Sequence, residues 1–469
     1  MRKIFTGAFF VSVLLTQAQE PAANPTNMQF SAVKHWSAVM SYTPPQGVDG
    51  FIVLRNISPV TDVPQDGVTY ERGQGIGSSK VIHVGGATII PVRELVENTT
   101  YHFAVFAYNG YGTNINYKQS DPLTGSLTTP ASDPGAYYQS IDTAAPDFLT
   151  KLTTLLQNHT FQSYTPGYAT NVIPNLFERD TINNQKVINC EYTNETTIYT
   201  PPFSFSTLQY NREHVLCKSW MKTYSMYGNN ITDYPEGADY FNLLLTKAAP
   251  NQARSNNPLG IVLNTQQTFG PSKFGTDNTG NLVFEPPLNR KGDAARAMFY
   301  EIVCYNGKSG NWGFDFLLSQ GPEQNVNVLK LWHQQDPPDK FERTKNELFY
   351  SLQNNRNPFI DHPAWVNCIN FDSLLKTAAC SYISSSTHDA PPVWRCYPIP
   401  ADNYLQIELP DASHQTLKLY DISGKLQLEL HVSSTLATID VSQLNAGLYI
   451  LELSHKYYAT PHRQLILLE

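Results

Sequence analysis

The sequence is poor in charge and, beyond its first residues, has no long apolar run. Charged residues occupy 15% of the 469 positions and hydrophobic residues 41%. This balance excludes a disordered chain, and the charge is too low for a coiled coil. The formal net charge of −8 excludes a protein that coats nucleic acid through overall basicity, although a local binding site remains compatible with it.

The one apolar run lies at the N-terminus, where residues 4–15 follow a short basic segment. These roughly 12 residues are too few for a bilayer about 30 Å thick, which makes a membrane anchor the weaker alternative. Small residues at Thr16 and Ala18 fit a cleavage site before Gln19. Residues 1–18 are therefore predicted to be a signal peptide, and the mature protein is expected to have no transmembrane segment.

Paired CxxC units are absent, which argues against a zinc site. An even number of cysteines in an exported protein allows up to three disulfides, with fifteen possible connectivities. The cysteines are Cys190, Cys217, Cys304, Cys368, Cys380 and Cys396.

Residues 27–130 alternate in short segments separated by turn signals, which predicts an all-β sandwich. The expected strands include residues 30–33, 36–42, 50–55 and 100–108. The region resembles a fibronectin type III domain, with Trp36 as its core tryptophan and a tyrosine corner at residues 95–101. Such a fold does not define a function, and a spacer or a substrate-presenting module are both open.

The linker at 131–147 and a second one at 381–394 separate a central region, residues 137–371, from a C-terminal one, residues 395–469. The central region is predicted to be α+β, and the C-terminal region to be a small all-β sandwich. The expected central helices include residues 148–157, 294–304, 329–332 and 348–352. The expected C-terminal strands include residues 405–409, 417–420, 437–441 and 448–453.

The stretch that carries chemistry is Glu213-His214, followed by Lys218-Ser219-Trp220. A hydrolytic metal site needs a hard oxygen ligand and a base that works near neutral pH, and this pair supplies one of each. Neighbours on a regular strand point to opposite faces, so a shared site requires a strand end or a bulge here. Alone, such a dipeptide is common by chance.

Several further motifs follow in order, at residues 250–260, 283–287, 291–297, 331–337 and 355–363. Together with Glu213-His214 they resemble the endonuclease I family, secreted or periplasmic nucleases of the His-Me finger (ββα-metal) group with little sequence preference. The resemblance implies a secreted nuclease that cleaves DNA, with RNA as the alternative substrate, and leaves 5′-phosphate ends.

The resemblance also implies roles for single residues. His214 corresponds to the general base, Glu213 and Asn251 to the ligands of one Mg²⁺ (Mn²⁺ or Ca²⁺ as substitutes), and Arg254 to a catalytic contact with the scissile phosphate. The candidate substrate-binding cations are Lys218, Arg296 and Arg356. For Arg296, pairing with Asp293 at i, i+3 is the structural alternative.

The sequence departs from the family at Leu216, Cys217 and residues 242–248, where the usual aromatic residue, proline and glycine are missing. A displacement of the general base by about 1 Å lowers the catalytic rate on the order of a hundredfold. The alternative function is therefore a catalytically degenerate surface adhesin or binding protein on the same scaffold.

The C-terminal region has motifs at residues 397–401, 419–425, 440–449 and 464–467. They resemble the sorting domain of the type IX secretion system. This resemblance implies export through the periplasm to the cell surface or the medium, with the secretion machinery as a partner.

Overall fold

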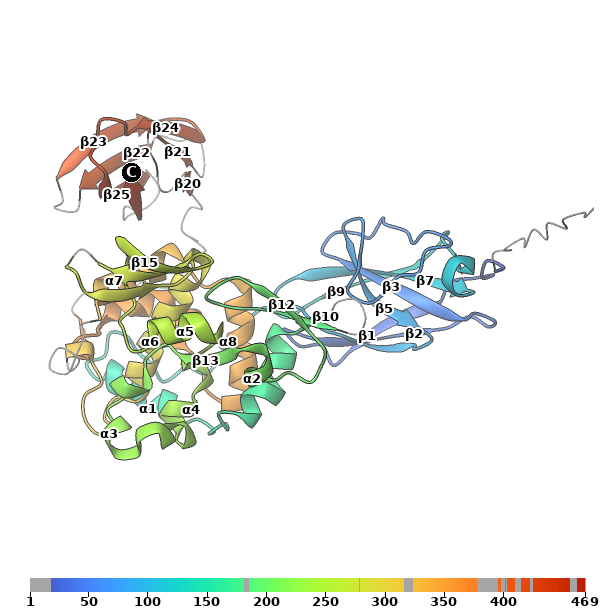
Figure 1. Ribbon diagram of the computed structural model, residues 1–469, viewed down its shortest axis with the longest axis horizontal. Coiled ribbons are helices and arrows are strands. Elements are labelled where there is room, and N and C mark those ends of the chain that lie inside the picture. Colours follow the sequence, from blue (N-terminus) through green and yellow to red (C-terminus); the bar gives the residue numbers. More distant parts are fainter. Residues whose placement is uncertain are drawn as a thin grey trace, which may run out of the picture. The chain divides into compact units, whose positions relative to one another are not determined.

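The structure is a computed structural model. It describes residues 18–180, 185–277, 279–315, 324–377, 395–397, 401, 403–409, 415–421, 425–455 and 462–468. The chain divides into two units, Met1–Ser381 and Tyr382–Glu469 (Figure 1). The signal-peptide prediction, apart from Ala18, and the linker at 381–394 lie outside the described residues. Across the described residues, no helix is long and apolar enough to cross a bilayer.

The first region is the predicted sandwich, made of two antiparallel sheets. One sheet contains β1 (Thr26–Ser31), β2 (Ala38–Thr43) and β6 (Ile89–Val92). The other contains β4 (Gly75–Ile76), β5 (Ser79–Gly85), β3 (Gly50–Asn56), β7 (Thr100–Asn109), β8 (Asn116–Tyr117) and β9 (Leu123–Thr128), which pairs with β7. A single helical turn, η1 (Gly112–Asn114), precedes β8.

Strand β7 shows why this segment folds as a strand buried on both sides. Phe103 and Val105 enter the core between the sheets, whereas Ala104 and Phe106 enter a second apolar cluster on the opposite face. The backbone N–H of Val96 donates to the Tyr101 hydroxyl at 3.0 Å, which confirms the predicted tyrosine corner.

The prediction for Trp36 was wrong. Its side chain is buried, but it belongs to the apolar cluster of the central region and not to the core between the two sheets. The position immediately precedes β2, at an end of the sandwich. Trp36 therefore joins the two regions of the first unit.

The central region is α+β, as predicted. Apolar residues in 148–157 recur at helical spacing, and Phe148, Leu152 and Leu156 are fully buried in the expected helix. Its helices and helical turns are α1 (Phe148–Gln157), the π-helix η2 (Tyr168–Phe177), α2 (Phe205–Leu208), η3 (Lys218–Trp220), α3 (Tyr224–Tyr227), η4 (Gly228–Asp233), α4 (Pro235–Ala238), η5 (Tyr240–Asn242), α5 (Ala248–Arg254), η6 (Leu288–Arg290), α6 (Lys291–Cys304), α7 (Val326–Gln335), α8 (Lys340–Gln353), α9 (Pro358–Asp361) and η8 (Pro363–Cys368).

Four small sheets complete this region. They consist of β10 (Arg179–Asp180), β11 (Lys186–Asn189), β12 (Thr196–Tyr199), β13 (Tyr210–His214), β14 (Leu243–Lys247), β15 (Asn264–Phe269), β16 (Ser272–Thr276), β17 (Leu282–Glu285), β18 (Ile369–Asn370) and β19 (Leu375–Lys376). The core is built around α6, which is buried along nearly its whole length.

The described part of the C-terminal unit has seven strands in two sheets, as predicted. They are β20 (Arg395–Tyr397), β21 (Tyr404–Glu408), β22 (Gln415–Asp421), β23 (Leu426–Val432), β24 (Leu436–Asp440), β25 (Gly447–His455) and β26 (His462–Leu468). Alternate residues of β22, Leu417 and Leu419, are fully buried in the core of this unit.

Four of the six cysteines are free thiols: Cys190, Cys217, Cys304 and Cys396. Three disulfides are therefore excluded. Cys368 is disulfide-bonded, and Cys380 lies outside the described residues.

Candidate active site

The site lies where β13 ends. β13 pairs antiparallel with β14, with Glu213 opposite Leu244 and His214 opposite Leu243. β14 continues directly into α5. The chain thus forms two strands and a helix, and the predicted strand end is present because His214 is the last residue of β13.

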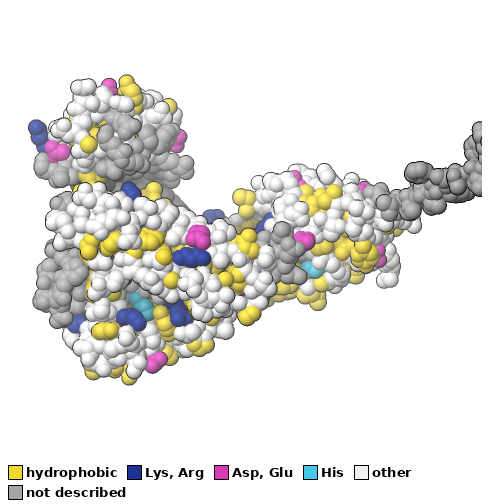
Figure 2. Space-filling view, in the orientation of Figure 1, with side chains coloured by type: hydrophobic (Ala, Val, Ile, Leu, Met, Phe, Trp, Pro, Cys, Tyr) yellow, Lys and Arg dark blue, Asp and Glu magenta, His cyan; other side chains and the backbone are white. Residues whose placement is uncertain are grey.

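A cavity of about 450 Å³ opens beside this strand end. Figure 2 shows a hollow in the central region with a histidine side chain inside it and cationic side chains at its edge. The cavity is lined by Tyr164, Asn211, Arg212, Glu213, His214, Cys217, Lys218, Ser219, Tyr224, Asn251, Arg254, Ser255 and Asn256. The structure therefore brings five of the seven predicted site residues together.

His214 is oriented by the backbone. Its Nε2 atom lies 2.8 Å from the carbonyl oxygen of Gly237, and because a carbonyl only accepts, Nε2 carries the proton. Burial, followed by smaller effects of nearby cations, lowers the pKa of His214 to about 3. The ring is therefore neutral, and its Nδ1 atom has a lone pair available to accept a proton. Tyr164 stacks on the ring at a centroid distance of 5.3 Å.

Glu213 is buried and held through one oxygen only. Tyr192 donates its hydroxyl to Oε1 at 3.1 Å, and Nη1 of Arg254 lies 3.1 Å from the same oxygen. Burial raises the pKa of Glu213 to about 7, although Arg254 and the two hydrogen bonds act in the opposite direction. Among the described residues, none bonds to Oε2, so this oxygen is left for a ligand in the cavity.

Asn251 and Lys218 also have unengaged side chains. Asn251 lies on α5 and Lys218 on η3, and both are half-buried at the cavity. Within the described part of the chain, neither side chain has a hydrogen-bond or ion-pair partner. The cavity therefore presents an amide oxygen, a carboxylate oxygen, an imidazole nitrogen and an ammonium group that the fold itself does not use.

Arg254 differs from these residues because the fold uses its guanidinium group. Nη1 donates to the carbonyl of His214 at 2.9 Å and Nη2 to that of Val215 at 2.7 Å, in addition to the ion pair with Glu213. The side chain is almost fully buried. This geometry favours a role in holding Glu213 and the end of β13 over a direct contact with phosphate.

Arg296 and Arg356, both predicted to bind substrate, are not at the cavity. Arg296 is buried between Asp293 and Glu342, with N–O distances of 3.0 and 2.6 Å. Arg356 is buried and pairs with Glu347 and Asp361 at 2.6 and 2.7 Å. Both are therefore corrected to structural residues, and the i, i+3 alternative for Arg296 is confirmed.

Arg212 is a cavity residue that the sequence reasoning missed. Its guanidinium lies 4.0 Å from the centre of the Tyr164 ring, and its Nε and Nη1 atoms are buried without a hydrogen-bond partner. Arg212 lies two residues before His214 on a strand, and residues at this spacing point to the same face. This spacing was the sequence signal that could have identified Arg212. A buried cation with unused donors is suited to an anionic ligand.

The departures from the family pattern have local replacements. The Asn242 side chain accepts from the backbone N–H of Leu216 at 2.7 Å and donates to its carbonyl at 3.1 Å, which fixes the chain after His214. The Cys217 thiol donates to the carbonyl of Ser255 at 3.5 Å, and burial raises its pKa to about 12. Cys217 is therefore a neutral thiol and not a thiolate ligand.

A larger depression of about 680 Å³ lies at the start of α5. Its lining includes Glu195 and Lys247, which pair with each other at 3.4 Å. It has no histidine, and its one carboxylate is exposed. Chemistry, and not size, therefore identifies the smaller cavity as the active-site candidate.

Comparisons with known proteins match the part of the chain that contains this cavity. The Endonuclease I family model matches residues 145–364, and the model for the Secretion system C-terminal sorting domain matches residues 395–467. The extracellular ribonuclease of Bacillus subtilis (strain 168) is 31% identical over 267 residues, which cover 54% of this chain and 87% of the relative. That of Bacillus amyloliquefaciens is 32% identical over 254 residues, with 52% and 82% covered.

The N-terminal sandwich has solved structural neighbours at low similarity. The fn3 domain of the human collagen alpha-1(XX) chain is 20% identical, covers 28% of this chain and 99% of that chain, and has a TM-score of 0.18. The fibronectin type-III domain of human fibronectin type III domain containing protein 3 is also 20% identical, with 26% and 94% covered and a TM-score of 0.17.

The Glu213–His214 pair lies at the end of a strand and shares its cavity with the helix that follows the partner strand. The chain belongs to the endonuclease I family. It is an enzyme, a nuclease that is secreted or displayed at the cell surface, and it carries the sorting domain that directs it to the secretion machinery.

Proposed function

We propose that this nuclease is a metal-dependent endonuclease with little sequence preference, which hydrolyses the phosphodiester bonds of DNA, and of RNA as a second substrate, to 5′-phosphate ends. The observation that carries the proposal is the free Nδ1 atom of His214 in one cavity with the unengaged oxygens of Glu213 and Asn251. A base beside two oxygen ligands is the arrangement that metal-assisted hydrolysis requires.

His214 is the general base in this proposal. The Gly237 carbonyl keeps the proton on Nε2, so Nδ1 is the atom that accepts a proton from the attacking water. Tyr164 stacks on one face of the His214 ring, and the Gly237 carbonyl binds one edge of it. Both contacts restrict the movement of the ring. This restriction holds the base in place, which supports catalysis because the rate depends steeply on its position.

Glu213 and Asn251 would hold the cation, and their oxygens suit Mg²⁺, with Mn²⁺ or Ca²⁺ as substitutes. The neutral thiol of Cys217 gives no reason to expect a thiol-preferring metal. When bound, the cation neutralises charge that develops on the phosphate and the leaving oxygen. Arg254 keeps Glu213 in place through Oε1, which leaves Oε2 to hold the cation in this proposal.

The cations of the cavity account for low sequence preference. Lys218 and Arg212 line the cavity, and in this proposal they contact phosphate oxygens, which carry no sequence information. The curated relatives are described as extracellular ribonucleases, which supports RNA as a second substrate.

The test is cleavage of supercoiled plasmid DNA and of single-stranded RNA by the full chain, with Mg²⁺ and with excess EDTA. We expect cleavage with Mg²⁺, loss of cleavage in EDTA, and recovery when Mg²⁺ is restored. Full activity in EDTA would contradict the metal dependence. Binding of either polymer without cleavage under any condition would favour the degenerate binding protein.

A further inference from the structure

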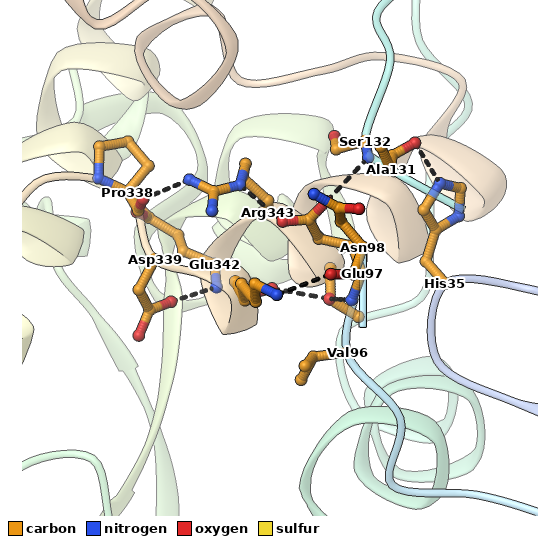
Figure 3. A network of polar contacts seen from close by, with 12 residues as sticks. His35, Val96, Glu97, Asn98, Ala131, Ser132, Pro338, Asp339, Glu342 and Arg343 are labelled. Atoms are coloured by element: carbon orange, nitrogen blue, oxygen red, sulfur yellow. Dashed lines mark hydrogen bonds and ion pairs between the residues drawn. The ribbon is translucent and has the colours of Figure 1, made fainter. Parts of the chain in front are cut away.

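The sandwich is fixed to the nuclease by a network of polar contacts (Figure 3). The Glu97 carboxylate pairs with Nε of Arg343 on α8 at 2.9 Å, and the Glu97 backbone N–H donates to the Thr344 hydroxyl at 2.9 Å. Lys340 donates to the carbonyl of Asn98 at 2.6 Å. These contacts tie the segment after β6 to the first turns of α8.

Three further contacts strengthen this junction. Trp36 packs into the apolar cluster of the nuclease. Ser132, in the predicted linker, donates to Glu347 at 2.6 Å, and Arg356 donates to Ser132 at 3.2 Å. A junction that buries an aromatic ring and the Glu97 carboxylate holds the sandwich as a fixed arm, so anything bound to the arm has a defined position relative to the cavity.

Cations are unevenly distributed on this arm. Its six lysines and arginines are Lys34, Arg55, Arg72, Lys80, Arg93 and Lys118. Four of them line one small depression with a single carboxylate, that of Glu94. We call Arg55, Arg72, Lys80 and Arg93 the cation cluster.

The cation cluster lies next to the junction. Arg93 and Glu94 immediately precede residues 95–97, the segment whose Glu97 contacts α8. Arg55 donates to the Arg93 carbonyl at 2.6 Å, which holds the two residues together. Lys80 lies 2.7 Å from Glu94.

The depression is lined by four cations and one carboxylate, that of Glu94. Glu94 pairs with both Lys80 and Arg55. The Arg93 side chain is exposed, and among the described residues it has no ion-pair partner. An excess of positive charge stands out on a chain whose formal net charge is −8.

We propose that the cation cluster is a second binding surface for the phosphate backbone of the nucleic-acid substrate, outside the catalytic cavity. The inference rests on the proposed function for the identity of the polyanion. Clustered cations bind a phosphate backbone without regard to sequence. Because the junction is fixed, a substrate long enough to reach both sites gains binding free energy from the cation cluster in addition to that from the cavity. The arm is then a substrate-binding module and not a spacer.

The test compares the full chain with the double variant Lys80→Gln/Arg93→Gln. The matched control is Lys34→Gln/Lys118→Gln, which removes the two cations of the arm that lie outside the cluster. Binding to a duplex of about 40 base pairs, roughly 140 Å long at 3.4 Å per pair, is measured in EDTA at several salt concentrations. Cleavage with Mg²⁺ is measured on this duplex and on one of about 8 base pairs.

We expect the slope of log affinity against log salt to fall by about 1.8 for the cluster variant, at about 0.9 for each lost phosphate contact in duplex DNA. KM should rise for the long duplex with kcat unchanged, and the short duplex should be cleaved as by the wild type. The control variant should retain the wild-type slope.

Three outcomes would overturn the proposal. The first is a cluster variant that binds and cleaves the long duplex as the wild type does. The second is an equal loss in the control variant, which would show a general effect of net charge. The third is a loss of binding to a sulfated polysaccharide such as heparin with nucleic-acid binding unchanged. A wild-type chain that neither binds nor cleaves nucleic acid would instead refute the proposed function.

Discussion

Glu213 and Glu301 are both buried carboxyl groups of the central region, and their surroundings differ. Burial raises the pKa of each, to about 7 for Glu213 and well above the ordinary value for Glu301. Glu213 has Arg254 and Tyr192 on one oxygen and a cavity at the other. Glu301, on α6, has neither oxygen bonded to any described residue, and it lines none of the described cavities.

The contrast shows that a buried acid with a raised pKa is not sufficient evidence for a functional site. Glu213 is identified by what surrounds it: a neutral base on the next residue, an unengaged amide on α5 and a cavity they share. Glu301 is surrounded by packed side chains and by the acidic Asp239 and Glu236. The surroundings of Glu213 are arranged for chemistry, whereas those of Glu301 impose a cost on stability that the nearby Lys308 offsets only in part.

The largest effect is expected at the base. His214→Ala removes the proton acceptor, and general-base catalysis typically contributes about 10²- to 10⁴-fold, so kcat should fall by that factor. The measurement is plasmid nicking at saturating Mg²⁺. Because a missing base is not replaced by metal, additional Mg²⁺ should not restore the rate. Cleavage at the wild-type rate would refute the active-site assignment.

A second effect should appear in stability alone. Arg296→Met leaves Asp293 and Glu342 buried without their shared partner, and breaking a buried ion pair typically costs about 3–5 kcal/mol. Urea unfolding measures the free energy of unfolding. Activity per folded molecule should be unchanged, since Arg296 is not among the residues that line the cavity. If the variant were stable but inactive, Arg296 would have to be assigned to the substrate-binding residues after all.

The metal ligands give a smaller and reversible effect. Asn251→Ala removes one proposed oxygen ligand, so the Mg²⁺ concentration for half-maximal activity should rise about tenfold or more, and high Mg²⁺ should restore part of the rate. The paired measurement is the melting temperature in EDTA, which should stay near the wild-type value because the Asn251 side chain has no partner among the described residues.

Patterns of local spacing predicted the fold well. The apolar periodicity of residues 148–157 gave α1 with its observed bounds, and the alternation in residues 100–108 gave most of β7. Trp36 could not be assigned in this way, because a local pattern shows that a ring is buried but not which of two regions buries it.

The site was predicted in part for the same reason. Glu213, His214 and Asn251 followed from a family resemblance, and the structure gathers them in one cavity. The Gly237 carbonyl that orients His214 lies 23 residues away along the chain, and no spacing rule points to it. Arg296 and Arg356 were misassigned because the sequence shows a charge but not the carboxylates that enclose it.

The smallest effect tests the other carboxyl group of the comparison. Glu301 is fully buried without a partner among the described residues, and its folded-state pKa lies well above the ordinary value of 4.5, through burial first and the charges of Asp239 and Glu236 second. Below pH 4.5 the folded and unfolded chains both keep this proton. As the pH rises, the unfolded chain releases it while the folded chain retains it, so the free energy of unfolding falls by up to about 1.4 kcal/mol per pH unit until the raised pKa is reached.

Glu301→Gln removes this proton without removing much volume. The variant should therefore gain stability over the wild type as the pH increases from about 5 to 7, and it should lose part of the wild-type slope of unfolding free energy against pH. The matched control is Glu195→Gln, which changes an exposed carboxylate and should leave the slope unchanged. Parallel pH profiles for Glu301→Gln and the wild type would mean that Glu301 is ionised in the folded protein. Its surroundings would then have to compensate the charge, and the distinction drawn between the two carboxyl groups would fail.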